Sequence, residues 1–154
     1  MSVADRLYRR VMNMVATVKI TATDDTGPVH RAQVRGFPPE TIDNMPVLQI
    51  YGLASHAMPG SDATALFTSG DRSNGTIIAT GNQQYRLRNL KSGEVALYDN
   101  GGNIVKLANG GNIEITCPHG ITIKCDTLTI NADSSITLTS PKVTVKSPNF
   151  SSGA

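Results

Sequence analysis

The residues best suited to metal binding lie close together in the second half of the chain. Cys117, His119 and Cys125 are near neighbours, and thiolates and imidazoles are the ligands that Zn²⁺ prefers. Their spacing lacks a Cys-x-x-Cys pair, and too few ligands are present for a closed zinc site. Each cysteine follows two alternating isoleucines in the same register, which is typical of a small core residue. We expect no metal here, because only a threefold site between copies would supply enough ligands.

Residue types used by hydrolases occur without the arrangement that hydrolysis needs. His56, Ser61 and Asp62 are close in sequence, but no Gly-x-Ser-x-Gly elbow accompanies them. Glycoside hydrolysis needs a pair of carboxylic acids, and a strand pattern turns one glutamate, Glu114, outward. We therefore predict that the protein is not an enzyme. The glutamates considered are Glu40, Glu94 and Glu114.

Charge and aromatic content disfavour nucleic-acid binding. The net charge is only +2 and aromatic residues make up 5% of the chain, whereas such proteins combine a basic groove with stacking aromatics. Phe37, Tyr51, Phe67 and Tyr85 are spread out, and the last three fall in alternating patterns that favour core positions. We expect no nucleic-acid partner.

The first 92 residues predict a short helix followed by a small barrel. Residues 1–14 form the helical segment, with Ser2 as N-cap, Asp5 in the first turn and apolar residues at i, i+4 and i+7. Residues 15–92 then change to strand periodicity, with turn signals at 24–28 and 37–40. Several strands without an intervening helix are typical of a closed barrel. The predicted strands are 15–23, 29–36, 45–51, 63–68 and 75–80.

Glycine-rich runs predict turns rather than ligand sites. Arg72 lies in a Gly-Asp-Arg-Ser run, where Asp71 and Ser73 can hydrogen-bond the backbone, so we interpret Arg72 as structural. Two Asn-Gly-Gly-Asn runs, at 100–103 and 109–112, lack the lysine and helix of a phosphate loop. We expect tight turns in which glycine supplies positive φ.

Residues 93–154 carry a repeated apolar–x–apolar unit. The regular pairs start 8, 7, 8 and 7 residues apart, and the residue between the members of each pair is Thr or Glu. Because strand side chains alternate faces, the paired residues share one face and the polar residues share the other. Val95/Leu97 and Val105/Leu107 extend the series upstream at wider spacing. The predicted core comprises Ile113, Ile115, Ile121, Ile123, Leu128, Ile130, Ile136, Leu138, Val143 and Val145.

This repeat predicts an oligomer. Each repeat contributes two large apolar side chains, and such short repeats cannot bury their apolar face alone. A single-chain β-helix would complete fewer than two coils, whereas three chains around one axis bring their apolar stripes together. The predicted fold is therefore all-β, a barrel followed by an intertwined triple-stranded β-helix in a homotrimer. An antiparallel meander stays open, because the spacing does not fix strand direction.

Two blocks of sequence carry a resemblance to a known family. Residues 52–60 and 65–79, above all Gly-Asp-Arg-Ser-x-Gly at 70–75, resemble the baseplate assembly protein V family, and the resemblance extends over essentially the whole chain. It implies an oligonucleotide/oligosaccharide-binding (OB) barrel over 15–92 and a trimeric β-helix needle over 93–154. It also implies a structural spike at the centre of a contractile phage-tail baseplate, driven through the host outer membrane on contraction.

The resemblance also sets expectations for partners and metal. The implied partners are two further copies, the baseplate hub, the tail tube and the host outer membrane; the implied location is the virion baseplate after synthesis in the host cytoplasm. Spikes of this family end in a His-x-His apex that binds iron. The histidines here, His30, His56 and His119, form no such pair, so we predict no cofactor and a chain truncated before its apex. The alternative function is an OB module that binds nucleic acid or glycan, with a passive β-stalk.

Overall fold

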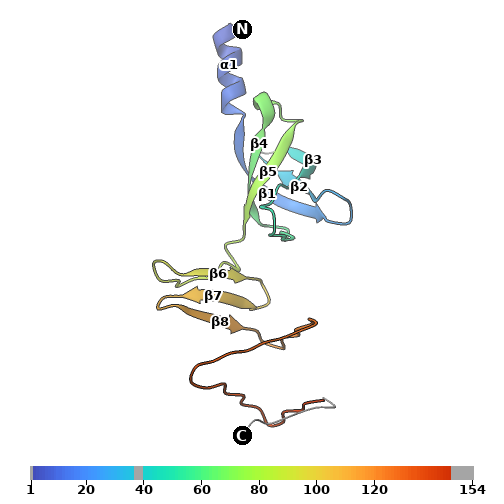
Figure 1. The fold of residues 1–154 in the computed structure, drawn as a ribbon. Coiled ribbons are helices and arrows are strands. Elements are labelled where there is room, and N and C mark those ends of the chain that lie inside the picture. Colours follow the sequence, from blue (N-terminus) through green and yellow to red (C-terminus); the bar gives the residue numbers. More distant parts are fainter. Residues whose placement is uncertain (1, 37–39, 147–154) are drawn as a thin grey trace. The chain divides into compact units, whose positions relative to one another are not determined.

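The structure is a computed structural model that describes residues 2–36 and 40–146, and the predicted break at 37–40 lies mostly outside them. Internal contacts divide the chain into two compact units, Met1–Pro118 and His119–Ala154. The first unit consists mostly of β-strands with one short helix, which confirms the all-β class (Figure 1). No helix among the described residues is sufficiently long and apolar to cross a bilayer.

The predicted N-terminal helix is present as α1, Val3–Met12. Ser2 and Asp5 form a capping box: the Asp5 backbone N–H donates to Ser2 Oγ, and the Ser2 N–H donates to Asp5 Oδ2, both at 3.0 Å. This satisfies two of the amides that a helix leaves unpaired at its start. The helix ends at Asn13, and β1 begins two residues later.

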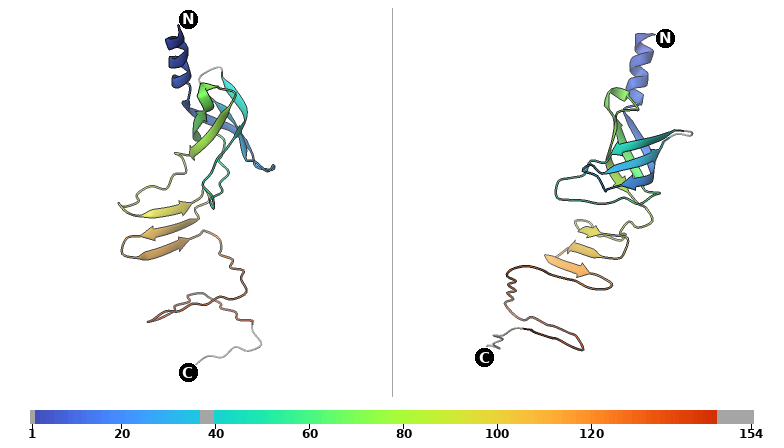
Figure 2. Two further views of the ribbon diagram at one scale, coloured as in Figure 1. Left: turned by 45° about the horizontal axis from the view of Figure 1, so that its top comes forward. Right: turned by 90° about the vertical axis from the view of Figure 1, so that its right-hand side faces the viewer.

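Five antiparallel strands form the first sheet, in the order β3-β2-β1-β4-β5. Register shifts in three of its strand pairs mark β-bulges, which bend and twist strands. The two edges meet where Val47 bridges Ile77 in parallel and the Leu48 N–H donates to the Ile77 carbonyl at 2.8 Å. The sheet thus curls back on itself (Figure 2). The strands are β1 Val15–Asp24, β2 Arg31–Arg35, β3 Thr41–Pro46, β4 Asp62–Phe67 and β5 Gly75–Gly81.

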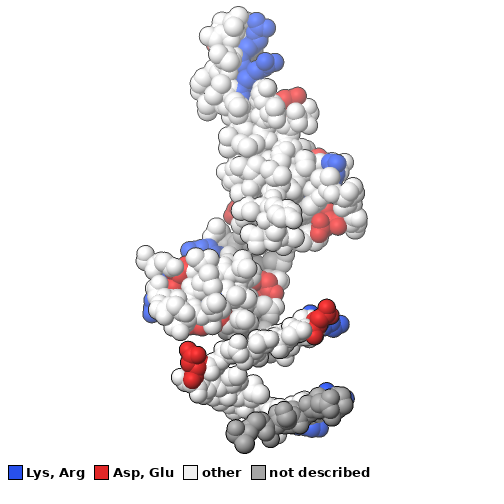
Figure 3. Space-filling model, viewed as in Figure 1, with Lys and Arg blue, Asp and Glu red and all other residues white. Residues whose placement is uncertain are grey.

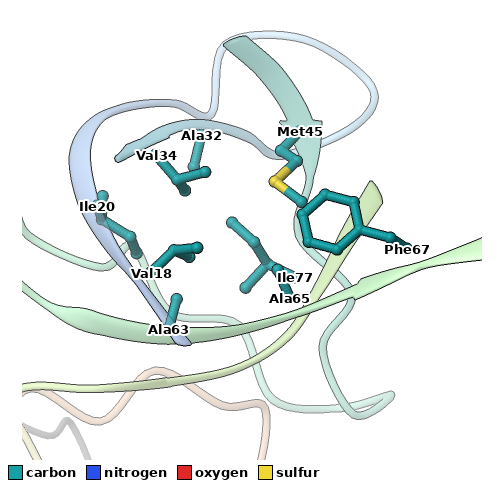
Figure 4. Close-up of a cluster of buried hydrophobic side chains, with 9 residues drawn as sticks. All are labelled: Val18, Ile20, Ala32, Val34, Met45, Ala63, Ala65, Phe67 and Ile77. Carbon is teal, nitrogen blue, oxygen red and sulfur yellow. The ribbon is translucent and has the colours of Figure 1, made fainter. Parts of the chain in front are cut away.

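The curled sheet encloses one core of nine buried apolar side chains (Figure 4). Alternate residues of each strand point inward, as the period-2 pattern of the sequence predicts. Phe67 is the largest of them and is 1% exposed, while its neighbour Leu66 points outward. Besides Phe67, the core contains Val18, Ile20, Ala32, Val34, Met45, Ala63, Ala65 and Ile77.

One predicted strand is misplaced. The strand expected at 45–51 is instead β3 at Thr41–Pro46, and the chain turns away after the Val47 bridge. The Gln49 side chain holds this new course: its amide donates to the Ser55 carbonyl at 2.6 Å and accepts from the Ser55 N–H at 3.0 Å. Tyr51 lies in the resulting turn, fully exposed, and Tyr85 is also exposed. The prediction of core positions for these two tyrosines was therefore wrong, and only that for Phe67 is confirmed.

A second sheet contains β6 Val95–Tyr98, β7 Ile104–Ala108 and β8 Asn112–Thr116, paired in sequence order as an antiparallel meander. Its connections are the two predicted Asn-Gly-Gly-Asn turns, with φ of +87° at Gly102, +83° at Gly110 and +78° at Gly111. Within the range predicted as intertwined β-helix, residues 95–116 thus adopt the meander that the sequence left open.

The second unit is described from residue 119 to residue 146. This stretch forms neither helix nor strand within the chain, and each of its residues is exposed. Backbone amides and carbonyls normally find partners in folded proteins, so a stretch of this length without helix or strand pairing is unusual for a chain on its own.

Candidate assembly surface

The second sheet has one entirely aliphatic face. The register aligns Val95 with Leu107 and Leu107 with Ile113, and it aligns the alternate residues of the three strands in the same way. All six side chains of this aliphatic face are exposed, Ile113 to 67%. A contiguous apolar surface on a soluble protein normally marks an interaction site. The aliphatic face comprises Val95, Leu97, Val105, Leu107, Ile113 and Ile115.

The opposite face of this sheet is mixed and partly covered: it carries Lys106 and Glu114 beside smaller apolar residues such as Ala96 and Ala108. Lys106 lies opposite Glu114 on β8, with Nζ 2.9 Å from the carboxylate, and this hydrogen bond raises the pKa of Lys106. Residues 87–90 line a small cavity together with Lys106 and Ile104. The prediction that Glu114 faces away from the apolar pairs is therefore confirmed.

The remaining predicted core residues lie in the second unit. They keep the apolar–x–apolar pattern, and every one of them is more than half exposed in the single chain. Their predicted role in a trimer core therefore stays a prediction. We call them the tail pairs: Ile121, Ile123, Leu128, Ile130, Ile136, Leu138, Val143 and Val145.

Arg72 has structural partners that the sequence did not indicate. Its guanidinium forms an ion pair with Glu40, with Nε 2.9 Å from Oε1, and it lies over the Phe67 ring at 3.9 Å from the centroid. The hydrogen bond from Arg72 lowers the pKa of the Glu40 carboxyl, against the opposing effect of burial. Ser73 donates to Asp71 through its N–H and its hydroxyl, which confirms the predicted turn. No sequence signal connects positions 40 and 72.

Of the residues considered for hydrolysis, His56 and Ser61 line one cavity, but Asp62 does not, and no hydrogen bond joins the three. Ser61 is buried and accepts a hydrogen bond from Asn82 at 3.1 Å, while Asp62 forms an ion pair with Lys19. His56 instead lies 2.5 Å from the Thr23 hydroxyl. The three residues therefore have three different partners. The glutamates also diverge: Glu40 binds Arg72, Glu94 accepts from the Lys91 N–H, and Glu114 binds Lys106.

The histidines and cysteines are distributed over both units. His30 and His56 lie edge to face in the first unit with ring centroids 5.4 Å apart, and His119 lies in the second unit. Both cysteines are free, Cys117 half-buried and Cys125 exposed. Within residues 2–36 and 40–146, no three His, Cys, Asp or Glu side chains gather as metal ligands do.

Sequence reasoning left four residues of the aliphatic face out of the predicted core. Val95, Leu97, Val105 and Leu107 stand at wider spacing than the regular repeat, because the longer turns separate their strands. The signal was nevertheless available. Two turns of the same sequence, each between alternating apolar runs, predict hairpins whose register places all six residues together.

Comparison with known proteins adds a family match to this geometry. Residues 18–84, which span most of the first sheet, match the family described as Bacteriophage Mu Gp45, N-terminal. One relative is the "Baseplate puncturing device gp45" of Escherichia phage Mu, 30% identical over 138 residues. The match covers 90% of this chain and 66% of the relative, so the chain spans just under two thirds of the relative's length.

Proposed function

We propose that the chain is the structural central spike of a contractile phage-tail baseplate, used as a homotrimer to pierce the host outer membrane. The observation that carries the proposal is the bare aliphatic face of β6–β8 together with the uncovered tail pairs. The phage Mu relative is named a puncturing device, and a rigid oligomer is suited to puncturing. The role is mechanical, so we infer no catalysis.

The energy of the exposed apolar side chains favours several copies over one. Burying a Val, Leu or Ile side chain contributes about 1.5–3 kcal/mol, and each copy has fourteen such side chains on the aliphatic face and in the tail pairs. We propose that three copies of the aliphatic face pack against one another. We further propose that residues 119–146 of the three copies wind together, each chain supplying the strand partners that the others lack.

We propose that the first sheet is an OB barrel. Two observations support this. The sheet has five strands, and its long first strand pairs with both β2 and β4. The β3 and β5 edges meet through the parallel Val47–Ile77 bridge. A small five-stranded barrel of this kind, with its core filled by side chains, is the architecture of that fold. The proposed domains are accordingly a helical segment at 1–14, the barrel at 15–92 and the β-helix needle at 93–154.

We infer the remaining partners and location from the similarity to this family. The proposed partners are the baseplate hub, the tail tube and the host outer membrane, and the proposed location is the virion baseplate after synthesis in the host cytoplasm. We propose that the described residues bind no metal, because the three histidines lack the His-x-His spacing of the expected iron site.

Sedimentation equilibrium of the purified chain tests the trimer directly. The expected mass is three times the chain mass of 16.3 kDa, unchanged on dilution, with high resistance to heat and detergent. A monomer would contradict the proposal. A further test of function is assembly of phage that encode a chain unable to form trimers: these should give no infective particles, although the barrel remains folded.

A further inference from the structure

The helix α1 is a further exposed apolar surface among the described residues. Its ten residues include none that is buried, although it projects from a folded barrel. An isolated helix of this length is only marginally stable in water, because most helix stability in proteins comes from packing of the apolar side. The exposed large apolar side chains are Val3, Leu7, Tyr8, Val11 and Met12, followed by Met14 just beyond the helix.

The apolar residues of α1 occupy half of its circumference. At 3.6 residues per turn, they spread over an arc of about 180°, and the charged residues fill the other half. A two- or three-stranded coiled coil uses a narrower seam of a and d positions. The wide arc instead suits a helix that lies in a groove and is covered along its whole apolar side.

The polar half of α1 is strongly basic. Arg6, Arg9 and Arg10 lie within five residues, and they form the cluster of positive charge on the helix in Figure 3. The single acidic residue of the helix, Asp5, is engaged in the capping box. Arg10 lies beside the Asp71 carboxylate, so three parallel copies of α1 would bring six further arginines together, Arg6 and Arg9 of each copy. Like charges at this spacing repel, so the charge disfavours a bundle of α1 copies and favours an acidic partner.

The helix is held firmly at its C-terminal end. The Phe67 N–H donates to the Met14 carbonyl at 2.8 Å, which connects the residue after the helix to the barrel core. Gly70, with φ of +70°, lies against the backbone of Arg10, where a Cβ atom would clash with the carbonyl. A preformed and anchored helix loses less conformational entropy on binding than a flexible tail does.

We propose that α1 is a docking element for another protein of the baseplate, and that it inserts into a groove with an apolar floor and a rim of Asp and Glu side chains. Arginine suits such a rim better than lysine, since its planar fork binds a carboxylate through two hydrogen bonds. That the partner is a baseplate protein rests on the proposed function. The docking site itself is distinct from the proposed trimer interface, and docking does not require the β-helix.

The test uses baseplates purified from phage that cannot make this chain. Purified full-length chain is added at physiological salt, and the bound fraction is measured by co-sedimentation. The double variant Arg6→Glu/Arg9→Glu should bind at least about tenfold more weakly, because charge reversal makes the rim repulsive. The matched control, Arg86→Glu/Arg88→Glu, changes the net charge equally at two exposed arginines outside the helix and should bind as the wild type does. Equal binding of all three, or equal loss in both variants, would overturn the proposal.

A fluorescent reporter and two competing outcomes complete the test. The sequence has no tryptophan, so Tyr8→Trp places a unique probe on the apolar half. Its emission should shift to shorter wavelength when the baseplates are added, and an unshifted spectrum would contradict docking. Stronger binding to phosphatidylglycerol vesicles than to baseplates would assign α1 to a membrane surface instead. Loss of the trimer in Leu7→Glu would assign it to self-association. Sedimentation of each variant separates these outcomes from failure of the trimer itself.

Discussion

The curled first sheet, β1–β5, and the β6–β8 sheet use the same alternating pattern with opposite results. In the first sheet, the apolar side of each strand faces a core in which Phe67 and Ile77 are essentially inaccessible. In the second sheet, the apolar side forms a face whose six side chains are all exposed among the described residues. The period-2 pattern therefore predicts which residues share a face, but it does not determine what covers that face.

Closure accounts for the difference. Three bulged strand pairs curl the first sheet until β3 reaches β5, so its apolar face meets itself. The second sheet has three short strands joined by tight turns, and three strands are too few to close. One region is thus self-sufficient within the chain, and the other requires an external partner. The following predictions test this contrast.

The largest effect is expected from a charge in the tail pairs. Ile123→Asp should abolish the trimer, since each copy would bury an unpaired carboxylate, which costs several kcal/mol. Thr122 is the neighbouring residue and is predicted to face the opposite side, toward water. Thr122→Asp should therefore leave the trimer intact. Sedimentation equilibrium measures both. An intact Ile123→Asp trimer with unchanged melting would show that Ile123 lies outside the core.

A cavity in the barrel should destabilise the chain without affecting assembly. Phe67→Ala is expected to cost about 3–5 kcal/mol of unfolding free energy, because a fully buried aromatic side chain is removed. Leu66→Ala, one residue earlier and facing outward, should cost less than about 1 kcal/mol. Urea denaturation, followed by the β-sheet circular dichroism signal, measures the unfolding free energy of both variants. Similar costs at the two positions would contradict the inside–outside contrast of β4.

Acid should weaken the barrel partly through Glu40. The hydrogen bond from Arg72 holds the pKa of Glu40 below its ordinary value of 4.5, so its stabilisation is complete above that value. The stabilisation is lost as the pH falls through the lowered pKa. Melting temperatures measured from neutral pH downward should therefore fall less steeply for Glu40→Gln than for the wild type. Identical slopes would mean that the ion pair does not contribute.

The smallest effect is expected at the mixed face of the second sheet. The Lys106–Glu114 pair is an exposed ion pair, with 55% of the Glu114 side chain accessible, and such pairs contribute about 0–1 kcal/mol. A double-mutant cycle of Lys106→Met and Glu114→Gln should give a coupling energy in this range that shrinks with added salt. A coupling of several kcal/mol would indicate that this face, rather than the aliphatic one, is buried on assembly.

Much of the local structure is predictable from the sequence, because it rests on local physics. The Ser2 cap, the strand alternation and the Asn-Gly-Gly-Asn turns each depend on residues a few positions apart. The Arg72–Glu40 pair and the β3–β5 closure depend on groups more than twenty residues apart, and no local signal specifies them. The strand misplaced at 45–51 fails for a related reason: a side-chain amide, Gln49, replaces backbone pairing there.

The direct passage from α1 into β1 has a mechanical consequence. β1 is hydrogen-bonded to β4 along its first half and to β2 along its second, with Lys19 in both registers. The ladder bonds of antiparallel strands run perpendicular to the strand axis. A force applied along β1 would therefore load these hydrogen bonds together in shear. They would not break one after another, as they would if the strand were peeled from the sheet. The first sheet is thus built to resist a pull along β1 with many hydrogen bonds at once.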